Sequence, residues 1–513
     1  MALLLGTDIG AQSLKVAIFD QTGAIRSFDQ IPYSIERPRP GWAESDPDIW
    51  WNCFCRAVKT CMEREGIQKE KIESVGISNM CPSLVAMDQS GNPLRPAILY
   101  LDQRSLSQSA KIVKIVGEDR LFEITGNRVA PGTYSATSML WIKEAEPDLF
   151  RKVRYFGHAN TFLAHRLTGE FAFDWTNASF TGLFRTADDR NWSEDLCYAL
   201  EIPRHLLPHP VISFHRIGYV HHHASRDTGL MSGTPVAIGG ADTACSALGA
   251  AVIDPGQALE TSGTSDVLCF CADRPLFDRR FMNRCHVIPD RWLLMGAMLS
   301  PGAALSWFRD QCCSEERQIA ERLQISPYRI MDLQAEQSPP GARGILFLPY
   351  LQGERSPVWD PHARGVFFGL SLESTKGDMI RSILEGTAYG LRQNLEVAES
   401  ELGLVASEIK SVGGGAKSLL WSQIKADILR RRITLLNYQE TAVLGAAMLG
   451  ALASGRYSNY REAVSQAAAS SARVLIPNPR LESFYARMYD SYVSLYLQLR
   501  ELFERTSRIP PAP

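Results

Sequence analysis

Asp8 stands between two glycines near the start of the chain, in a stretch suited to binding phosphate. Residues 4–19 read LLGTDIGAQSLKVAIF, two apolar runs around a short loop of small and polar residues, which predicts a hairpin. Gly6 and Gly10 let a bulky ligand approach the backbone, and successive loop amides can bind an anion. Because a carboxylate repels phosphate unless a cation lies between them, Asp8 is predicted to be a partner of Mg²⁺-phosphate. An ordinary glycine-containing hairpin is the alternative.

A second loop of the same kind lies in the other half of the chain. Residues 257–268, QALETSGTSDVL, again place a loop of glycine and hydroxyl residues between two strand-like runs. Neither loop is a Walker A motif, and neither leads into a helix as a dinucleotide-binding glycine motif does. One phosphate loop near the start of each half therefore suggests two related domains that close on one nucleotide.

Asp242 is a second carboxylate in a setting that a substrate could reach. A buried strand over residues 233–238 ends in Gly239 and Gly240, and a helix of small residues begins at Asp242. The glycines leave space for a substrate, and the macrodipole at the helix N-terminus is expected to keep the carboxylate ionised. An N-cap aspartate without a role in chemistry is the alternative.

A further group of polar residues follows an apolar strand over residues 95–101. The strand delivers Asp102, Gln103 and Arg104 together. Sugar hydroxyls need charged or bidentate hydrogen bonds to replace water, so this trio suits sugar recognition. A salt bridge at the end of the strand is the alternative.

In their order along the chain, these motifs resemble those of the FGGY carbohydrate kinases. The matching segments are DxGxxSxK at 8–15, GGAD at 239–242, GTS at 263–265, GVFFGL at 365–370 and GGGAKS at 413–418. The resemblance runs from about residue 3 to 455. It implies an α/β chain with two actin-like ATPase (ribonuclease H-like) domains and a cleft between them. It also implies an enzyme that phosphorylates a sugar with ATP and Mg²⁺.

The resemblance implies roles for individual residues. Asp242 would take the proton from the attacking hydroxyl, and Asp8 would orient Mg²⁺, directly or through water. The residues implied at the sugar are Met80, Cys81, Tyr100, Asp102 and Asp242. Those implied at the nucleotide and its phosphates are Gly10, Ser13, Gly263, Thr264, Ser265, Gly302, Gly414, Gly415, Ala416 and Ser418. Lys15 faces either solvent or the phosphates, and both interpretations stay open.

The acceptor is predicted from the residues that follow Ser78. Glycerol kinases of the family place an Arg-Glu pair there, whereas residues 79–83 read NMCPS, so glycerol is not expected. Xylulokinases carry Gln-Met-His there, which this chain does not reproduce, but the pattern from residue 95 to 242 favours xylulose or a related pentulose. Ribulose, a sugar alcohol, or a non-catalytic ATPase-fold binding protein are the alternatives. Ala11 and Gln12, where hydroxyl residues are usual, and Ser138, in place of a signature lysine, are expected to affect turnover more than fold.

Composition limits the remaining possibilities. The chain has 513 residues, of which 45% are apolar, and a net charge of −2, so we expect a large core and no nucleic-acid or membrane partner. No apolar run reaches a membrane-spanning length, and residues 1–5 are too short for a signal sequence, which predicts a cytoplasmic protein. The partner is a small sugar, and a homodimer is expected only by analogy with the family. Eleven scattered cysteines without a CxxC pair argue against zinc and disulfides.

The order of elements predicts two α/β domains and a terminal helix. We place the first domain at 1–251, the second at 252–480 and a terminal helix with a disordered tail at 481–513. Helical signals predict helices over 47–65, 380–398 and 485–503. Residues 509–513 are expected to be disordered.

Overall fold

The first sheet carries the hairpin around Asp8. The computed structural model describes residues 2–508. Its seven-stranded first sheet has the order β11-β12-β5-β1-β2-β3, with β13 also on β5. β1 runs antiparallel to β2, where Asp8 faces Lys15, and parallel to β5, where Asp8 faces Ser78. The bounds are β1 Leu3–Ile9, β2 Ser13–Asp20, β3 Ile25–Pro32, β5 Ile72–Asn79, β11 Arg216–Tyr219, β12 Pro235–Ala237 and β13 Gly240–Ala241.

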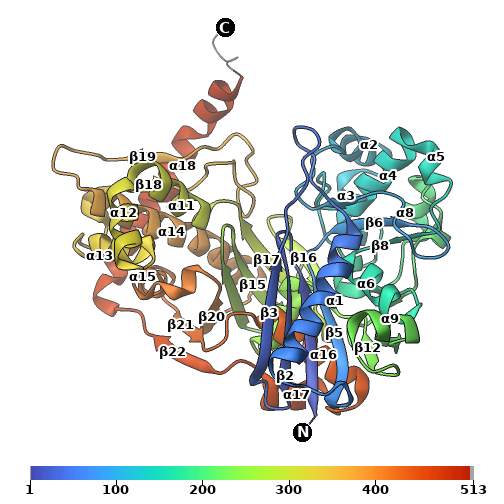
Figure 1. The fold of residues 1–513 in the computed structure, drawn as a ribbon. Coiled ribbons are helices and arrows are strands. Elements are labelled where there is room, and N and C mark those ends of the chain that lie inside the picture. The colour runs from blue at the N-terminus through green and yellow to red at the C-terminus, as the bar shows by residue number, and fades with distance from the viewer. Residues whose placement is uncertain (1, 509–513) are drawn as a thin grey trace.

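Helices and a small second sheet complete the first half of the molecule. The four-stranded sheet β4-β7-β6-β8 lies beside the first sheet, and helices surround both (Figure 1). The strands are β4 Glu44–Ser45, β6 Ser83–Met87, β7 Ala97–Leu99 and β8 Tyr155–Gly157, with a separate pair β9 Phe173–Asp174 and β10 Pro210–Val211. The helices are α1 Pro47–Arg64, α2 Leu106–Val116, α3 Glu118–Thr125, α4 Ser135–Ala145, α5 Pro147–Phe150, α6 Ala159–Thr168, α7 Trp175–Ala178, α8 Glu194–Ala199, α9 His222–Thr228 and α10 Asp242–Gly249.

The second half repeats the plan with another seven-stranded sheet. Its order is β16-β17-β15-β14-β20-β21-β22, and the second phosphate-loop hairpin is β14-β15. The strands are β14 Gln257–Ser262, β15 Asp266–Ala272, β16 Met282–Cys285, β17 Trp292–Met298, β20 Glu408–Val412, β21 Arg432–Leu436 and β22 Ser471–Leu475, with a separate pair β18 Leu346–Leu348 and β19 Val366–Phe368. The helices are α11 Pro301–Cys312, α12 Ser314–Leu323, α13 Pro327–Glu336, α14 Lys376–Leu402, α15 Leu419–Leu429, α16 Thr441–Ser454, α17 Tyr460–Ala467 and α18 Glu482–Ser507.

Helix α16 crosses from the second half of the sequence to the sheet of the first half. It packs on β1, β5 and α10 (Figure 1). Glycines allow this approach, because a Cβ at Gly6 would lie 2.1 Å from the carbonyl oxygen of Val443, and one at Gly76 only 1.7 Å from that of Ala446. The same holds for α10, where a Cβ at Gly249 would lie 2.2 Å from the carbonyl oxygen of Thr441. The division at residue 252 therefore describes the sequence better than the packing.

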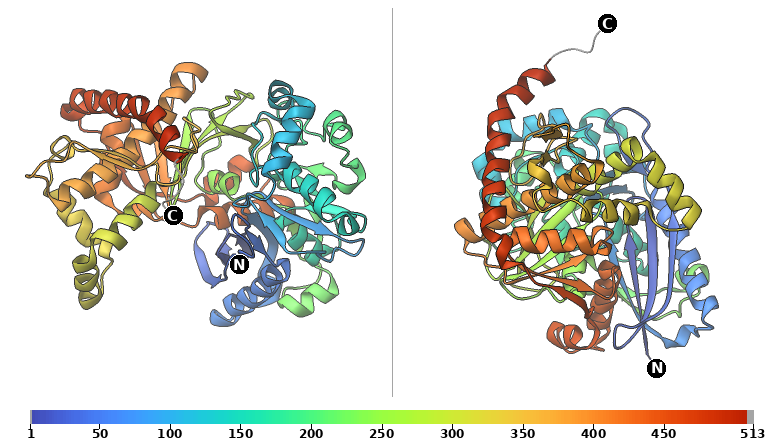
Figure 2. Two further views of the ribbon diagram at one scale, coloured as in Figure 1. Left: turned by 90° about the horizontal axis from the view of Figure 1, so that it is seen from above. Right: turned by 90° about the vertical axis from the view of Figure 1, so that its left-hand side faces the viewer.

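The structure confirms most of the predicted elements. Both hairpins form, α1 and α14 cover the first two predicted helices, and α18 extends the third. Helix α18 runs along the outer side of the second half, and its last turns project beyond the body (Figure 2). The disorder expected for 509–513 concerns a segment outside the described residues. Within residues 2–508, no helix is long and apolar enough to cross a membrane.

Candidate active site

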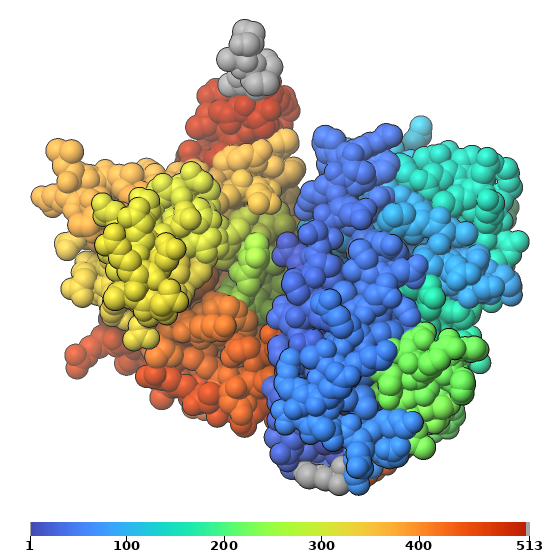
Figure 3. Space-filling view, viewed as in Figure 1, coloured from blue at the N-terminus to red at the C-terminus, as the bar shows by residue number. Residues whose placement is uncertain are grey.

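A cleft of about 330 Å³ separates the two halves and brings together residues from both phosphate-binding regions. The space-filling view shows the hollow between the blue first half and the orange and yellow second half (Figure 3). The cleft is lined by Asp8, Lys15, Asp242, Thr243, Ser246, Thr261, Val412, Gly413, Gly414, Lys417, Gln439, Glu440, Thr441 and Ala442. Asp8 and Asp242, separated by more than 230 residues of sequence, thus line one cavity.

Asp8 occupies the end of β1 and faces this cleft. Its Oδ1 accepts a hydrogen bond of 2.7 Å from the hydroxyl of Ser78 on the adjacent strand. Burial, reinforced by the charge of Asp242, raises the pKa of Asp8 to about 6. Two carboxylates in one cavity repel each other, and a divalent cation would relieve that repulsion. The donor set fits Mg²⁺, which in phosphate-transfer sites takes one or two protein carboxylates and completes its shell with phosphate and water.

Lys15 lies on the opposite strand of the first hairpin and lines the same cleft. Its ammonium group forms an ion pair with Glu440, at the start of α16. Both side chains are partly exposed, at 23% and 31%. Lys15 therefore faces the cleft, and its contact with phosphates stays a prediction.

Asp242 is the first residue of α10 and is held by the helix itself. The backbone N–H of Thr243 donates a hydrogen bond of 2.6 Å to its Oδ1. Burial nevertheless raises the pKa of Asp242, and Arg284 is the strongest opposing influence. Burial thus opposes the ionised form that the helix N-terminus is expected to favour, and the ionisation of Asp242 stays a prediction. A carboxylate whose pKa is shifted toward neutrality is better suited to accept a proton.

A buried network fixes the backbone that presents Asp242. The N–H of Ala241 donates to the hydroxyl of Thr176 at 2.8 Å. That hydroxyl donates to Asp174, which also accepts from Asn160 and Asn177 at 2.8 and 2.7 Å. The segment around residues 171–179 thus positions Asp242 by holding the backbone of the preceding residue, Ala241.

The predicted sugar residues are divided between two places. Met80 is buried, and Cys81 is half-buried with a thiol pKa raised by burial to about 12. Burial raises the pKa of Tyr100, as does the charge of Asp242, so Tyr100 lies within the field of the catalytic candidate. Of the predicted sugar residues, only Asp242 is among those that line the cleft, so the roles of Met80, Cys81 and Tyr100 stay predictions.

Asp102 is engaged elsewhere. The side chain is fully buried, and its two oxygens accept hydrogen bonds from Arg104 at 2.9 and 2.7 Å and from the N–H of Ala43 at 2.6 Å. Arg104 also forms an ion pair with Glu44 at 2.7 Å and lies over the ring of Trp42. The structure therefore places Asp102 in the strand-end salt bridge that the sequence left as the alternative.

The first two predicted phosphate loops are closed by their own backbones. The N–H of Gly10 donates to the carbonyl of Ser13 at 3.0 Å, and that of Gly263 to the carbonyl of Ser265 at 2.9 Å. Gly302, in the first turn of α11, touches the second loop so closely that a Cβ there would lie 1.9 Å from the carbonyl oxygen of Gly263. Thr264 lies between these contacts, so α11 begins directly against the second loop.

The third glycine-rich loop follows β20. Gly413 adopts a φ of +96° and its N–H donates to Gln439 at 2.7 Å. Gly414 lines the cleft, whereas Gly415 packs on the side chain of Ser262 and Ala416 is buried. Ser418 caps α15 by accepting a hydrogen bond of 3.1 Å from Trp421. The loop therefore meets the cleft mainly through Gly413 and Gly414.

Sequence reasoning missed a buried charge cluster beneath the second loop. The ammonium of Lys425, on α15, contacts Glu260 and lies 2.9 Å from the hydroxyl of Ser262 and 3.3 Å from Asp266. All three charged side chains are at most 2% exposed. The acids at either end of the loop could have signalled the cluster, but the position of Lys425 depends on tertiary packing.

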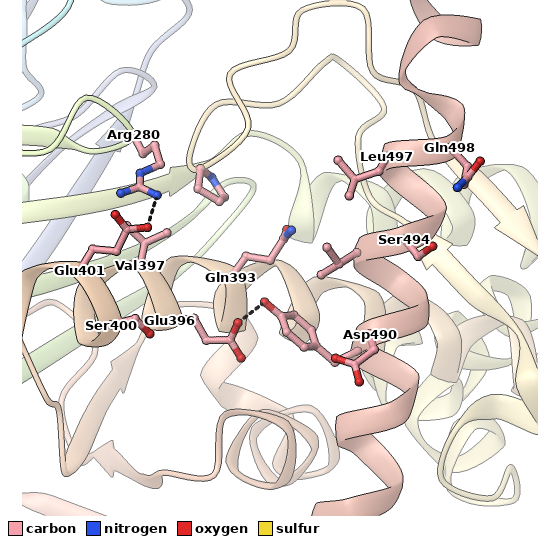
Figure 4. Close-up of a pocket in the computed structure, with 13 residues that line it drawn as sticks. Arg280, Gln393, Glu396, Val397, Ser400, Glu401, Asp490, Ser494, Leu497 and Gln498 are labelled. Carbon is pink, nitrogen blue, oxygen red and sulfur yellow. Dashed lines mark hydrogen bonds and ion pairs between the residues drawn. The ribbon is translucent and has the colours of Figure 1, made fainter.

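A larger cavity of about 680 Å³ lies between α14 and α18, away from the phosphate loops. Two pairs of its polar groups bond to each other: Arg280 with Glu401 at 2.8 Å (Figure 4), and Tyr489 with Glu396 at 2.7 Å. The inter-domain cleft, which holds Asp8, Asp242 and the third glycine-rich loop, is the better candidate site.

Comparison with known proteins covers almost the whole chain. Residues 3–249 match the N-terminal domain, and residues 258–454 the C-terminal domain, of the FGGY family of carbohydrate kinases. Xylulose kinase from Bacillus subtilis is 30% identical over 506 residues, covering 98% of each chain. Gluconokinase from Bacillus licheniformis is 30% identical over 511 residues, covering 98% of this chain and 96% of that one.

Solved structures agree with this assignment. The crystal structure of a xyloylose kinase from Brucella ovis matches with a TM-score of 0.87 at 28% identity, covering 98% of this chain and 100% of that one. Xylulose kinase from Rhodospirillum rubrum matches with a TM-score of 0.88 at 27% identity, with the same coverage. The predicted α/β fold with two actin-like domains is confirmed.

Proposed function

Because the chain belongs to the FGGY family of carbohydrate kinases, we propose that it transfers the γ-phosphoryl group of ATP to a hydroxyl group of a five-carbon ketose such as xylulose. Sugar kinase activity follows from the family. The pentulose is supported by the names of relatives that align over nearly their whole length. The observation that carries the proposal is the presence of Asp8 and Asp242 in one cleft lined by both halves.

Asp242 acts as the general base. The acceptor hydroxyl gives its proton to the Asp242 carboxylate while its oxygen forms a bond to the γ-phosphorus. The bond from that phosphorus to the oxygen bridging to the β-phosphate breaks, and ADP leaves with the electron pair. Such transfers depend on positioning and charge neutralisation more than on covalent catalysis. The pKa of Asp242, raised by burial, suits this proton transfer.

Asp8 is the residue that would hold Mg²⁺, directly or through water. When bound, the ion would neutralise charge on the transferring phosphoryl group. Lys15, across the hairpin from Asp8, adds a second cationic group to the phosphate side. The loops at Gly10–Ser13 and Gly263–Ser265 are proposed to donate backbone and hydroxyl hydrogen bonds to phosphate oxygens.

The direct test is ATP turnover with a panel of acceptors. Purified protein with Mg²⁺ would be assayed for ADP release with xylulose, ribulose, xylitol and glycerol, and with Asp242→Asn as the inactive control. We expect turnover that depends on a pentulose and is lost in the variant. ADP release with no dependence on any acceptor would overturn the proposal, and a higher kcat/KM with glycerol than with every pentulose would overturn the choice of substrate.

Location and assembly are further proposals. A cytoplasmic location is supported by a sugar kinase's need for ATP, and a homodimer rests on analogy alone. Light scattering coupled to size-exclusion chromatography would measure the mass in solution.

A further inference from the structure

Lys417 is a cation at the inter-domain cleft that forms no ion pair within the protein. It ends a short 3₁₀ turn, Gly415–Lys417, in the third glycine-rich loop, and it lines the cleft together with Gly413 and Gly414. The residue is exposed, and none of the ion pairs or side-chain hydrogen bonds found among residues 2–508 involves its ammonium group. The charge of Lys417 is therefore available to a ligand that enters the cleft.

The charges of the cleft leave a need for this cation. The charged residues that line the cleft are the acids Asp8, Asp242 and Glu440 and the lysines Lys15 and Lys417. Lys15 forms an ion pair with Glu440, so its charge is already balanced within the protein. Because the acids outnumber the lysines, a polyphosphate that enters the cleft needs positive charge in addition to that of Mg²⁺. Lys417 can supply that charge without first breaking an ion pair.

The backbone on both sides of Lys417 is held by packing and by a helix cap. Before it, Ala416 is buried, and a Cβ at Gly415 would lie 2.2 Å from the hydroxyl of Ser262. After it, the side chain of Ser418 caps α15 by accepting a hydrogen bond of 3.1 Å from the first turn of that helix. Because the backbone is fixed, Lys417 loses mainly side-chain freedom when it binds a ligand, which lowers the entropic cost of binding.

The loop that carries the lysine is joined to both regions proposed to hold phosphate. The N–H of Gly413 donates a hydrogen bond of 2.7 Å to Gln439, and the next residue, Glu440, pairs with Lys15 of the first hairpin. A Cβ at Gly413 would lie 2.5 Å from the carbonyl oxygen of Ser262, the residue that precedes the second phosphate loop. These contacts place the third loop beside the phosphate-binding elements of both halves.

We propose that Lys417 binds the α- or β-phosphate of the nucleotide, the two phosphates that stay with ADP. The inference rests on the proposed kinase function and adds a nucleotide-binding residue to it. Asp8 and Asp242, which are proposed to act on the transferring phosphoryl group, come from the first half of the chain, whereas Lys417 comes from the second. An ammonium group on a flexible stem binds phosphate oxygens through charge-assisted hydrogen bonds.

Binding titrations test this contact without relying on turnover. The unmodified protein and Lys417→Met would each be titrated with ADP, adenosine and xylulose 5-phosphate by calorimetry, with Mg²⁺ present throughout. We expect Kd for ADP to rise about five- to tenfold in the variant, with Kd for adenosine and for xylulose 5-phosphate unchanged. Because salt screens a contact between charges, Kd for ADP should also depend less on ionic strength in the variant.

Two further variants and a kinetic measurement sharpen the test. Lys417→Arg keeps the charge and should retain most of the affinity for ADP. Lys114→Met removes an exposed lysine of α2 outside the cleft, so it is the matched control for net charge and should bind ADP as the unmodified protein does. Lys417→Met should raise KM for ATP by the same factor as Kd for ADP and leave kcat within about twofold, because a phosphate that is not transferred is bound alike in the ground and transition states.

The possible results separate this inference from the proposed kinase function. If the unmodified protein binds ADP and Lys417→Met binds it equally well, Lys417 is a solvated surface residue, and the kinase function stands. Equal weakening of ADP and adenosine would indicate a disturbed loop and overturn the phosphate contact. Weakening of xylulose 5-phosphate alone would assign Lys417 to the product and also overturn it. Failure of the unmodified protein to bind ADP would remove both proposals.

Discussion

The two phosphate-loop hairpins resemble each other in sequence, yet they use their carboxylates in opposite ways. In the first hairpin, Asp8 faces the cleft opposite Lys15 and shares the cavity with Asp242. In the second, Glu260 and Asp266 turn into the protein, where Lys425 neutralises them. The first arrangement is open to the cleft, whereas the second is closed and internally paired.

This difference shows that a glycine-containing hairpin in the sequence does not by itself identify a functional carboxylate. A carboxylate near such a loop can bind a ligand or take part in a reaction only if it lines a cavity without a neutralising partner. The same residue type, provided with a buried lysine, becomes part of the support for the loop. Four substitutions would break or sharpen this contrast.

The largest effect is expected at the open site. Asp242→Asn removes the base and should lower kcat by roughly 10²–10⁴, while nucleotide binding survives because the phosphate loops are unchanged. Single-turnover kinetics and a nucleotide-binding titration measure the two properties. A variant with near-normal acceptor-dependent turnover would exclude Asp242 from the mechanism.

Breaking the closed cluster should affect stability first. Lys425→Met leaves Glu260 and Asp266 buried without their counter-ion, which we expect to lower the free energy of unfolding by about 3–5 kcal/mol. Urea denaturation measures the loss. Lys111→Met, which removes a partner of Glu144 at the surface, is the control and should show no measurable loss. If the two variants had equal free energies of unfolding, the buried cluster would not contribute to the stability of the fold.

Ionisation of Asp8 should lower the stability of the ligand-free protein as the pH rises through the range from about 4 to about 6. Its pKa is raised from 3.8 to about 6, so the unfolded chain releases this proton first and stability falls as pH rises through that window. Because the side chain is only half-buried, Asp8→Asn should gain about 1–2 kcal/mol at pH 8 and nothing at pH 3. Added Mg²⁺ should stabilise the parent protein more than the variant. A gain that is the same at both pH values would rule out ionisation as its cause.

The smallest change in stability is expected for Lys15→Met. Its ion pair with Glu440 is partly exposed, so we expect a loss of at most about 1 kcal/mol. KM for ATP should nevertheless rise about tenfold, the equivalent of one charge-assisted hydrogen bond, with KM for the sugar unchanged. An unchanged KM for ATP would return Lys15 to a purely structural role.

The sequence predicted features that depend on local pattern. Apolar runs and glycines located both hairpins, and the helical signals over 47–65 located α1, which Asp46 caps. The position of Asp242 followed from the two glycines before it. Asp102 shows the limit of prediction from local pattern. The same strand-end pattern suits sugar binding or an ion pair, and only the folded protein shows that Asp102 bonds to Arg104 and Ala43.

Residues that act across long distances in sequence were not predictable in this way. Arg284 lies in an unremarkable β-strand, and it is buried in the folded protein, where the side chains of Asn127 and Ser179 bond the backbone on either side of it. From the sequence, Lys425 resembles a solvent-facing residue of α15, but in the structure it is buried against acidic residues of β14 and β15. Nothing local in either segment distinguishes a buried cation from an exposed one.

The crossing of α16 onto the first sheet has a consequence for how the protein is made. The face of β1 and β5 at Gly6 and Gly76 is covered by α16, which is synthesised about 190 residues after α10 ends. At elongation rates of about 5–20 residues per second, that face stays uncovered for roughly 10–40 s. During translation the first half is therefore an incomplete domain with an uncovered sheet face, and we expect its folding to finish only after α16 has been synthesised.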